Sequence, residues 1–256
     1  MKISLEIRKT AVCLCFLLWA SLMAAQERKT HENVVSLNYL QVDEELNYGL
    51  VFRGPGLSYS FAAETENRKR LVNYSCNFGF TYLETRKIAA GNLQFVPFRL
   101  KYLCKPFSDT SFYIGPYLIG EYNYEVYPDL QSGFSYWLTH VSVGINFKYQ
   151  TRYMNNLVTF SLSSTLAGMV SRTAPYKNPY FYDLSFGDVI RYVNSDFTLE
   201  TVNRFNQSGI EIRWQPGLAF RLAFAYVFEY YGYYDYPRMT MINQMAKVII
   251  LPKPKT

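Results

Sequence analysis

Beyond its first 25 residues, the sequence lacks any long apolar run. A helix that crosses a bilayer needs roughly 18 or more consecutive apolar residues, and no later stretch approaches that length. Histidine is also scarce, since the chain contains only two, His31 and His140. With no cluster of cysteine and histidine, the sequence offers no typical zinc site. We therefore exclude a helical membrane protein and expect neither a metal nor another cofactor.

Charge and cysteine are limited as well. Charged residues make up 18% of the chain, and its net charge of +6 comes from scattered rather than clustered basic residues. Nucleic-acid binding is therefore not expected, because it needs a basic patch. Only Cys76 and Cys104 follow residue 25, and both fall on the apolar face of a predicted strand. A disulfide between them is possible in an exported protein, but nothing in the sequence requires one.

The first 25 residues have the layout of a secretory signal peptide. Lys2, Arg8 and Lys9 precede the apolar run "AVCLCFLLWASLMAA", which ends in small residues. This order predicts export, with cleavage after Ala25. The alternative is a transmembrane anchor, for which the apolar run is short.

Aromatic residues are plentiful, at 18% of the chain, with 24 tyrosines and 19 phenylalanines. They recur in long stretches in which apolar and polar residues alternate, such as "LVNYSCNFGFTYLE" and "HVSVGINFKYQ". Alternate side chains of a strand point to opposite faces, so each stretch predicts a strand with one apolar and one polar face. No internal repeat of fixed period is present beyond this rhythm.

Alternation also occurs in soluble sandwiches and lipocalin-like barrels, whose apolar faces point inward. Three features favour a membrane barrel. The strands are longer than the five or six residues typical of globular proteins, and they reach the nine to eleven that a tilted spanning strand needs. Polar residues occupy the middle of long strands, as a wet lumen allows, and tyrosines gather near strand ends, where an aromatic girdle would lie.

The sequence thus predicts an all-β fold, a single transmembrane antiparallel up-and-down β-barrel of about 12 strands, with ten as the alternative. Residues 1–25 are the expected signal peptide, 26–45 a periplasmic lead-in, 46–251 the barrel and 252–256 a basic tail. Short connections are expected at one end, at 64–70, 105–110, 151–156, 194–196 and 216–217. The longest connections, 125–137 and 169–184, are expected at the other end. The expected strands are 46–53, 57–63, 71–83, 92–104, 111–124, 138–150, 157–168, 185–193, 197–205, 209–215, 218–231 and 239–251.

Taken together, the signal peptide and the Tyr- and Phe-rich alternating strands that begin "LNYGLVFRGPGLSYSF" resemble a known group of proteins. The sequence is similar to the uncharacterised outer-membrane β-barrel proteins common in Bacteroidota. The resemblance covers essentially the whole chain after the signal peptide. It implies a location in the cell outer membrane and no established activity.

One pair of residues raises the question of catalysis. Outer-membrane phospholipase A and the lipid A deacylases carry a His-x-Ser pair on a barrel strand, and this chain has His140 and Ser142. Two residues apart on a strand, base and nucleophile share a face. Here Val141 and Val143 belong to the lipid face, so the pair is expected to face the lumen, away from a lipid substrate. We expect no enzyme, with a lipid hydrolase as the alternative.

The predicted lumen faces carry charges of both signs. Such residues either form ion pairs that plug a barrel of this size or line a narrow path for small anionic or neutral solutes. These residues are Arg99, Lys101, Glu121, Lys148, Glu200, Arg204, Glu211, Arg213, Arg221 and Glu229.

The two longest predicted loops are rich in aromatic residues. Rings on loops stack on sugars or dock protein partners, although they more often form the girdle and pack the loops. The residues are Tyr127, Phe134, Tyr136, Trp137, Tyr176, Tyr180, Phe181 and Tyr182.

The leading prediction is a non-enzymatic outer-membrane barrel, either a narrow solute channel or a structural or binding component. Its expected partners are outer-membrane lipid, a small solute or glycan, and other envelope proteins. A secreted soluble barrel that carries a lipophilic ligand is a further alternative.

Overall fold

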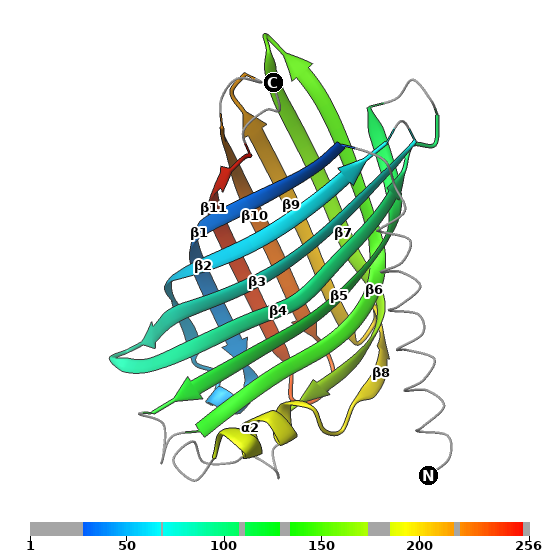
Figure 1. The fold of residues 1–256 in the computed structure, drawn as a ribbon. Helices are drawn as coiled ribbons and strands as arrows, with labels where there is room; N and C mark the ends of the chain where they lie inside the picture. The colour runs from blue at the N-terminus through cyan, green and yellow to red at the C-terminus, as the bar shows by residue number, and fades with distance from the viewer. Residues whose placement is uncertain are drawn as a thin grey trace.

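The computed structural model describes residues 28–67, 69–107, 111–128, 134–173, 185–217 and 221–252. The predicted signal peptide and the last four residues of the predicted basic tail lie outside the described residues. Within them, one antiparallel sheet curls into a barrel of steeply slanted strands (Figure 1). The strands are β1 (Arg28–Glu44), β2 (Val51–Glu66), β3 (Arg70–Thr85), β4 (Ile88–Cys104), β5 (Phe112–Tyr127), β6 (Phe134–Tyr153), β7 (Asn156–Arg172), β8 (Thr198–Thr201), β9 (Phe205–Gln215), β10 (Leu222–Tyr233) and β11 (Met239–Ile250).

The ring is closed by ten of these strands. Each of β1 to β6 pairs with the next, β6 pairs with β7, β7 with β9, and β9 to β11 follow until β11 returns to β1. The short β8 prolongs the row of β9, because both pair with β7 at successive positions. The prediction of a membrane-type barrel is confirmed, and its strand number is the lower of the two counts that the sequence allowed.

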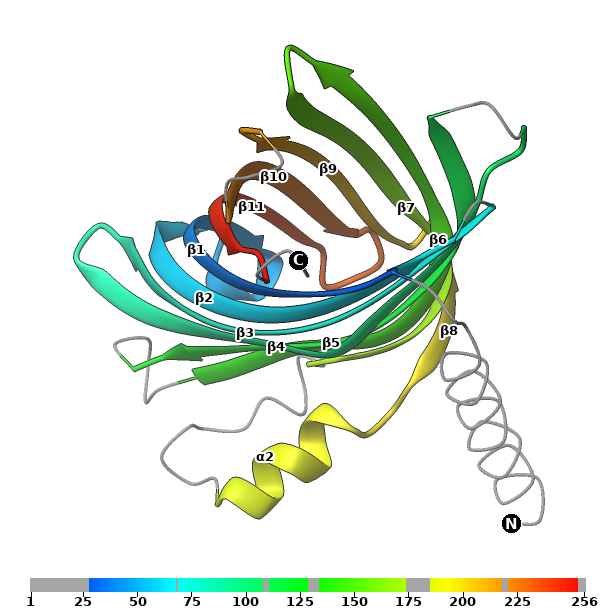
Figure 2. The ribbon, with the colours of Figure 1, turned by 45° about the horizontal axis from the view of Figure 1, so that its top comes forward.

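The two ends of the barrel differ. At one end, which we call the terminal end, β1 begins, β11 ends, and β6 turns into β7 at Met154 and Asn155 (Figure 2). The other end, which we call the helical end, carries the 3-10 helix η1 (Glu45–Asn47) and the helix α2 (Phe186–Val193). No helix among the described residues is long and apolar enough to cross a bilayer.

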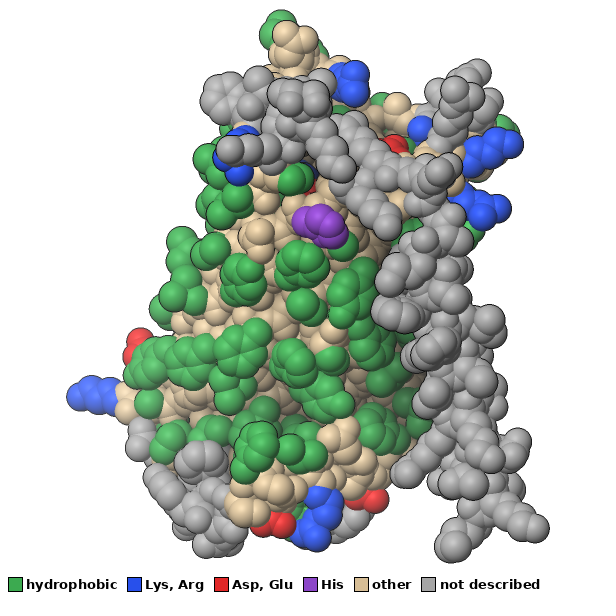
Figure 3. All heavy atoms as spheres, viewed as in Figure 1, with side chains coloured by type: hydrophobic (Ala, Val, Ile, Leu, Met, Phe, Trp, Pro, Cys, Tyr) green, Lys and Arg blue, Asp and Glu red, His purple; other side chains and the backbone are tan. Residues whose placement is uncertain are grey.

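The outer wall of the barrel is apolar. Figure 3 shows hydrophobic side chains spread over the middle of the visible wall, with charged side chains confined to its two ends. Large apolar side chains face outward on all sides of the ring. Ten of them are between 41% and 65% exposed: Leu37, Leu57, Phe78, Phe80, Val143, Phe160, Ile212, Phe224, Tyr226 and Val248. The apolar face of each alternating strand therefore points out, as the sequence predicted.

Two predicted boundaries near the first strands need correction. Residues 26–45 were expected to be a lead-in, but Arg28–Glu44 form β1, which pairs with both β2 and β11. The segments 46–53 and 57–63 were expected to be separate strands, but β2 runs through "GPG" without a turn. An ideal Cβ at Gly54 would lie 2.1 Å from the carbonyl oxygen of Tyr82, so glycine here permits close strand approach rather than a bend.

The predicted strand 185–193 is also wrong, since Phe186–Val193 form helix α2. The Ser185 side chain accepts a bond from the backbone N–H of Asp188, and the Asp188 carboxylate accepts one from the backbone of Ser185. This capping box satisfies N–H groups that the first turn of a helix leaves open. The turn at 194–196, expected among the short connections, consequently lies at the helical end.

Candidate functional site

The half of the barrel interior nearer the helical end is filled by a continuous apolar cluster, which we call the plug. All ten ring strands contribute to it. Phe52 packs edge-on against Tyr127 at 4.8 Å between ring centroids, and Tyr127 meets Tyr136 at 5.1 Å. The members are Leu40, Val42, Phe52, Leu83, Ala90, Tyr127, Tyr136, Leu138, Val170, Phe205, Tyr231, Met239 and Met241, and none is more than 4% exposed. Fully burying one large apolar side chain contributes about 1.5–3 kcal/mol, so the plug is a major source of stability.

A buried ion pair seals the outer side of the plug. The Arg172 guanidinium donates to the carboxylate of Glu44 and to the carbonyl of Pro237, and it lies 4.8 Å above the ring of Tyr233. Beside it, the Tyr127 hydroxyl donates to Glu125. The contacts of Arg172 join β1, β7 and β10 across the rim, so polar as well as apolar contacts close the helical end.

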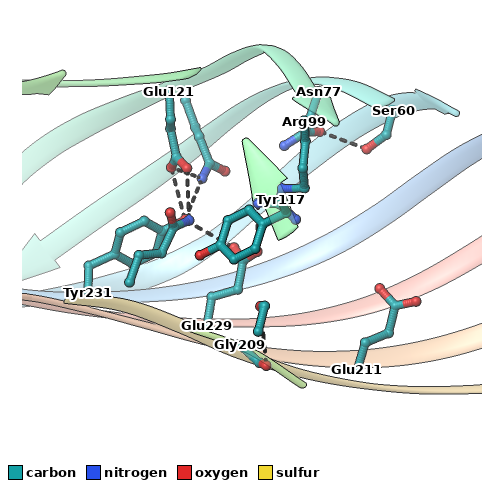
Figure 4. A network of polar contacts seen from close by, with 12 residues as sticks. Ser60, Asn77, Arg99, Tyr117, Glu121, Gly209, Glu211, Glu229 and Tyr231 are labelled. Atoms are coloured by element: carbon teal, nitrogen blue, oxygen red, sulfur yellow. Dashed lines mark hydrogen bonds and ion pairs between the residues drawn. The ribbon is translucent and has the colours of Figure 1, made fainter. Parts of the chain in front are cut away.

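A polar layer follows below the plug, centred on Glu121 of β5. Its carboxylate accepts bonds from Gln94 at 2.7 Å and Asn123 at 2.8 Å, and from Tyr231 at 2.9 Å and Gln207 at 3.1 Å. Figure 4 shows Glu121 and Tyr231 reaching toward each other from opposite walls. A buried carboxylate is tolerated only when hydrogen bonds satisfy its lone pairs. The bonds to Glu121 come from β4, β5, β9 and β10, so this carboxylate links four strands across the interior.

His140 and Ser142 belong to this layer and face the lumen, as the sequence predicted. His140 Nδ1 lies 3.0 Å from Ser142 Oγ, and His140 Nε2 lies 3.6 Å from the Glu121 carboxylate. The order Ser–His–Glu matches that of hydrolase triads. However, neither His140 nor Ser142 is exposed, and the histidine ring packs at 4.8 Å from Phe205 of the plug. No substrate reaches this serine in the observed conformation.

The half of the interior nearer the terminal end holds a chamber of about 1350 Å³. Residues at the terminal rim, among them Gln150, Gln215 and Leu251, line it, so it opens at that end. Its inner limit includes Arg99 and Glu229, next to the polar layer. No member of the plug lines the chamber. The lumen is therefore a cup closed at the helical end rather than a continuous path.

Four ion pairs cross the walls of the chamber. Two are close, Arg99 with Glu229 at 2.9 Å and Arg213 with Glu32 at 2.8 Å, the second with both guanidinium nitrogens donating. The others join Lys148 with Glu64 at 3.0 Å and Lys247 with Glu211 at 3.4 Å. Each pair joins strands that are not neighbours in the ring, so these contacts brace the barrel across its interior.

The ten charged residues singled out from the sequence fall into four groups. Seven line the chamber, and Glu121 lies in the polar layer. Glu200 is buried near the helical end, where Thr198 donates to it at 2.8 Å. The placement of Arg204 in the lumen was wrong, because it occupies the turn between β8 and β9 and its side chain is 62% exposed. The seven are Arg99, Lys101, Lys148, Glu211, Arg213, Arg221 and Glu229.

The aromatic residues assigned to outer loops need the same kind of correction. Tyr127 ends β5 and Tyr136 lies in β6, and both are buried in the plug. Trp137 faces outward, but α2 covers it with the ring of Tyr192 at 5.9 Å. Phe134 begins β6. The strands simply extend farther than the alternation indicated, so these residues do not form a loop surface. Tyr176, Tyr180, Phe181 and Tyr182 lie outside the described residues.

Sequence reasoning missed the acidic partners Glu32 and Glu64 and the pair Glu44–Arg172. The alternation in "HENVVSLNYLQV" would have placed Glu32 on an inner face had that segment been assigned to the barrel. Cys76 and Cys104 are both free. Among the described residues, no three His, Cys, Asp or Glu side chains gather closely enough to hold a metal ion.

Comparison with known proteins gives resemblance in shape alone. No protein-family model matches the chain, and no curated protein matches its sequence. Among solved structures, the translocator domain of the autotransporter NalP from Neisseria meningitidis is similar over 96% of this chain and 97% of its own, with 7% identity and a TM-score of 0.43. The outer-membrane protease OmpT from Escherichia coli is similar over 88% and 96%, with 6% identity and a TM-score of 0.47. The COG4313 outer-membrane channel from Pseudomonas putida F1 is similar over 89% and 97%, with 6% identity and a TM-score of 0.39.

Proposed function

We propose that this chain is an integral outer-membrane β-barrel that does not conduct solutes, and that its chamber is a binding site open to the periplasm. The observation that carries this proposal is the plug, to which every strand of the ring contributes. A conducting pore needs a water-filled path from end to end. The plug, the Glu44–Arg172 pair and the Glu121 layer stand in that path.

Membrane insertion is supported by the outer wall and by closure of the ring. In hydrocarbon, each unpaired backbone group costs several kcal/mol, so only helices and closed barrels span a bilayer. Here β11 pairs with β1 and leaves the ring without an open edge. A soluble carrier barrel would need the opposite arrangement, with its apolar side chains around the ligand and its polar ones outside.

The orientation follows from the connections. Barrels of this class have short periplasmic turns, and their longer connections lie outside the cell. The β6–β7 turn lies at the terminal end, whereas the connection between β7 and β8 contains α2 and lies at the helical end. The chamber would thus face the periplasm and the plug the exterior.

Two measurements test this function together. Cell fractionation should recover the chain in the outer membrane, with a gel mobility that changes on heating. In planar bilayers the purified protein should give a flat current trace under an applied voltage. Stable conductance steps from the wild-type protein would contradict the sealed barrel, and recovery in the soluble fraction would contradict the membrane location.

The Ser–His–Glu contact favours a second candidate, a lipid acyl hydrolase. For that function the plug would have to open, because Ser142 is buried at its inner side. Incubation of the folded protein with phospholipid and with lipid A, in parallel with Ser142→Ala, would detect it. Acyl release by the wild type alone would establish the hydrolase and overturn the binding role.

A further inference from the structure

Lys101 is a cation inside the chamber, and no described residue of opposite charge is in contact with it. It lies on β4 two positions from Arg99, so both side chains share the inner face. The four ion pairs of the chamber use Arg99, Lys148, Arg213 and Lys247. Lys101 makes no hydrogen bond or ion pair with any of the described residues, although it lines the chamber.

The surroundings of Lys101 are mostly of its own sign. Arg99, Lys148 and Lys247 all act on its ammonium group as like charges, whereas Glu211 and Glu64 act on it as opposite charges. Glu64 already contacts Lys148 at 3.0 Å. Glu211 already contacts Lys247 at 3.4 Å. Holding several cations together inside a barrel is unfavourable unless anions balance them. A further negative charge next to Lys101 would therefore be favourable.

The lining of the whole chamber has the same imbalance. Among the described residues that line it, seven basic residues face five acidic ones, and one of the acidic residues, Glu66, accepts a bond from the Tyr113 hydroxyl. Arg152 and Arg221, which make no ion pair among the described residues, are exposed near the mouth, where cations attract anions from solution. The seven are Arg99, Lys101, Lys148, Arg152, Arg213, Arg221 and Lys247, and the five are Glu32, Glu64, Glu66, Glu211 and Glu229.

We infer that the chamber binds a small organic anion through a phosphate or carboxylate group, and that Lys101 is its direct ligand. Lys101 supplies up to three N–H donors and a charge, and Arg99 stands beside it. The volume of about 1350 Å³ leaves room for the rest of a small molecule beyond its anionic group. This inference rests on the proposed function in one respect, the opening of the chamber to solution.

Calorimetric titration of the folded protein in detergent tests the ligand class. The probes are pyrophosphate, citrate and, as a neutral control, glucose, applied to the wild type, Lys101→Met and Lys69→Met. Lys69 lies in the β2–β3 turn at the same end but does not line the chamber, so its variant makes the same change of charge outside the site. We expect the wild type and Lys69→Met to bind at least one anion equally well and glucose not at all. Lys101→Met should bind that anion about tenfold more weakly or worse, a loss of about 1.4 kcal/mol.

A labelling experiment provides a readout that does not depend on affinity. The labelling uses a background in which Cys76→Ser and Cys104→Ser remove the native thiols. In that background the thiol of Lys101→Cys should react with a water-soluble thiol reagent. The anion that binds the wild type should not slow this reaction, because the variant lacks the lysine that binds the anion. Asn73→Cys, which faces the same chamber and retains Lys101, should be protected by that anion. Preference for pyrophosphate over citrate would identify a phosphate ligand, and the reverse a carboxylate.

Two outcomes would overturn the inference. One is failure of the wild type to bind either anion, and the other is equal affinity of Lys101→Met and the wild type. Failure of the sealed-barrel proposal would instead appear as current in a planar bilayer, which these titrations do not measure. If the protein conducts and still binds anions through Lys101, the result would support the anion site and contradict the sealed barrel.

Discussion

The two halves of the barrel interior are built by the same strands and differ in almost everything else. On β1, Leu40 and Val42 belong to the plug, whereas Glu32, on the same face, lines the chamber and pairs with Arg213. The outer face of β1 stays apolar along both halves, with Val35 and Leu37 exposed. The contrast teaches that the inner face of one strand can build an apolar core at one end and a charged chamber at the other, while its outer face stays apolar throughout.

Truncation inside the plug should have the largest effect. Phe52→Ala removes a ring that is fully buried against Tyr127, so we expect a loss of about 3–5 kcal/mol in unfolding free energy. Urea titration of the protein in lipid vesicles measures it. Leu57→Ala, on the outer face of the same strand, should lose far less, because its side chain remains among lipid tails. Equal losses of unfolding free energy in the two variants would show that burial in the plug stabilises the barrel no more than contact with lipid.

Removing the central carboxylate comes next. Glu121→Ala leaves the Gln207 amide without its acceptor and removes the closer of two acceptors from Gln94 and from Tyr231, and we expect a loss of about 3 kcal/mol. Glu84→Ala is the control, since Glu84 is exposed on β3. The same urea titration compares them. An unchanged urea midpoint for Glu121→Ala would mean that water replaces the carboxylate without loss of stability. The polar layer would then not stabilise the barrel.

Breaking a chamber ion pair should have a smaller effect. Arg213 and Glu32 lie where water reaches them, with side chains 19% and 12% exposed, so we expect a coupling free energy of about 1 kcal/mol. A double-mutant cycle with Arg213→Met and Glu32→Gln measures it. In planar bilayers neither variant should conduct, because the plug remains. Current through Arg213→Met would place the barrier to ions in the chamber instead.

Ser142→Ala should have a similarly small effect on stability. The substitution removes one hydrogen bond to His140, so we expect a loss of about 1 kcal/mol in unfolding free energy. We expect no change in acyl hydrolysis of phospholipid or lipid A. Thin-layer analysis of lipid products, with the Ser161→Ala variant as a control, measures this. Ser161 also faces the interior on β7, but among the described residues it makes no hydrogen bond to a histidine. Hydrolysis that disappears only in Ser142→Ala would contradict the structural reading of this serine.

Much of the barrel could be predicted, because alternation decides which face of a strand meets lipid. Leu57, Phe78 and Val143 all point outward as expected. The plug could not be predicted in the same way. Alternation places Phe52 and Tyr127 without showing that β2 and β5 bring them together, since contact between them depends on strand stagger around the ring. Helix α2 did have a local signal, the Ser185–Asp188 capping pattern, but the segment 185–193 was predicted as a strand.

The candidate site was predictable in part for a related reason. Inward-facing charges such as Arg99 and Arg213 follow from their strand positions, whereas their partners lie 130 and 181 residues away in the chain. No local pattern contains that information. The absence of a partner for Lys101 was equally hidden, because it depends on which carboxylates the other cations occupy.

The pairing of β1 with β11 sets a condition on biogenesis. The seam aligns residues 33–44 with residues 239–250, so the earliest strand waits for the latest before its hydrogen bonds are complete. Until then the backbone groups along both edges of the sheet lack partners, which is unfavourable in hydrocarbon. Pairings between residues so far apart in the sequence also form slowly. Ring closure and entry into the bilayer are therefore coupled, and both depend on the last strand of the chain.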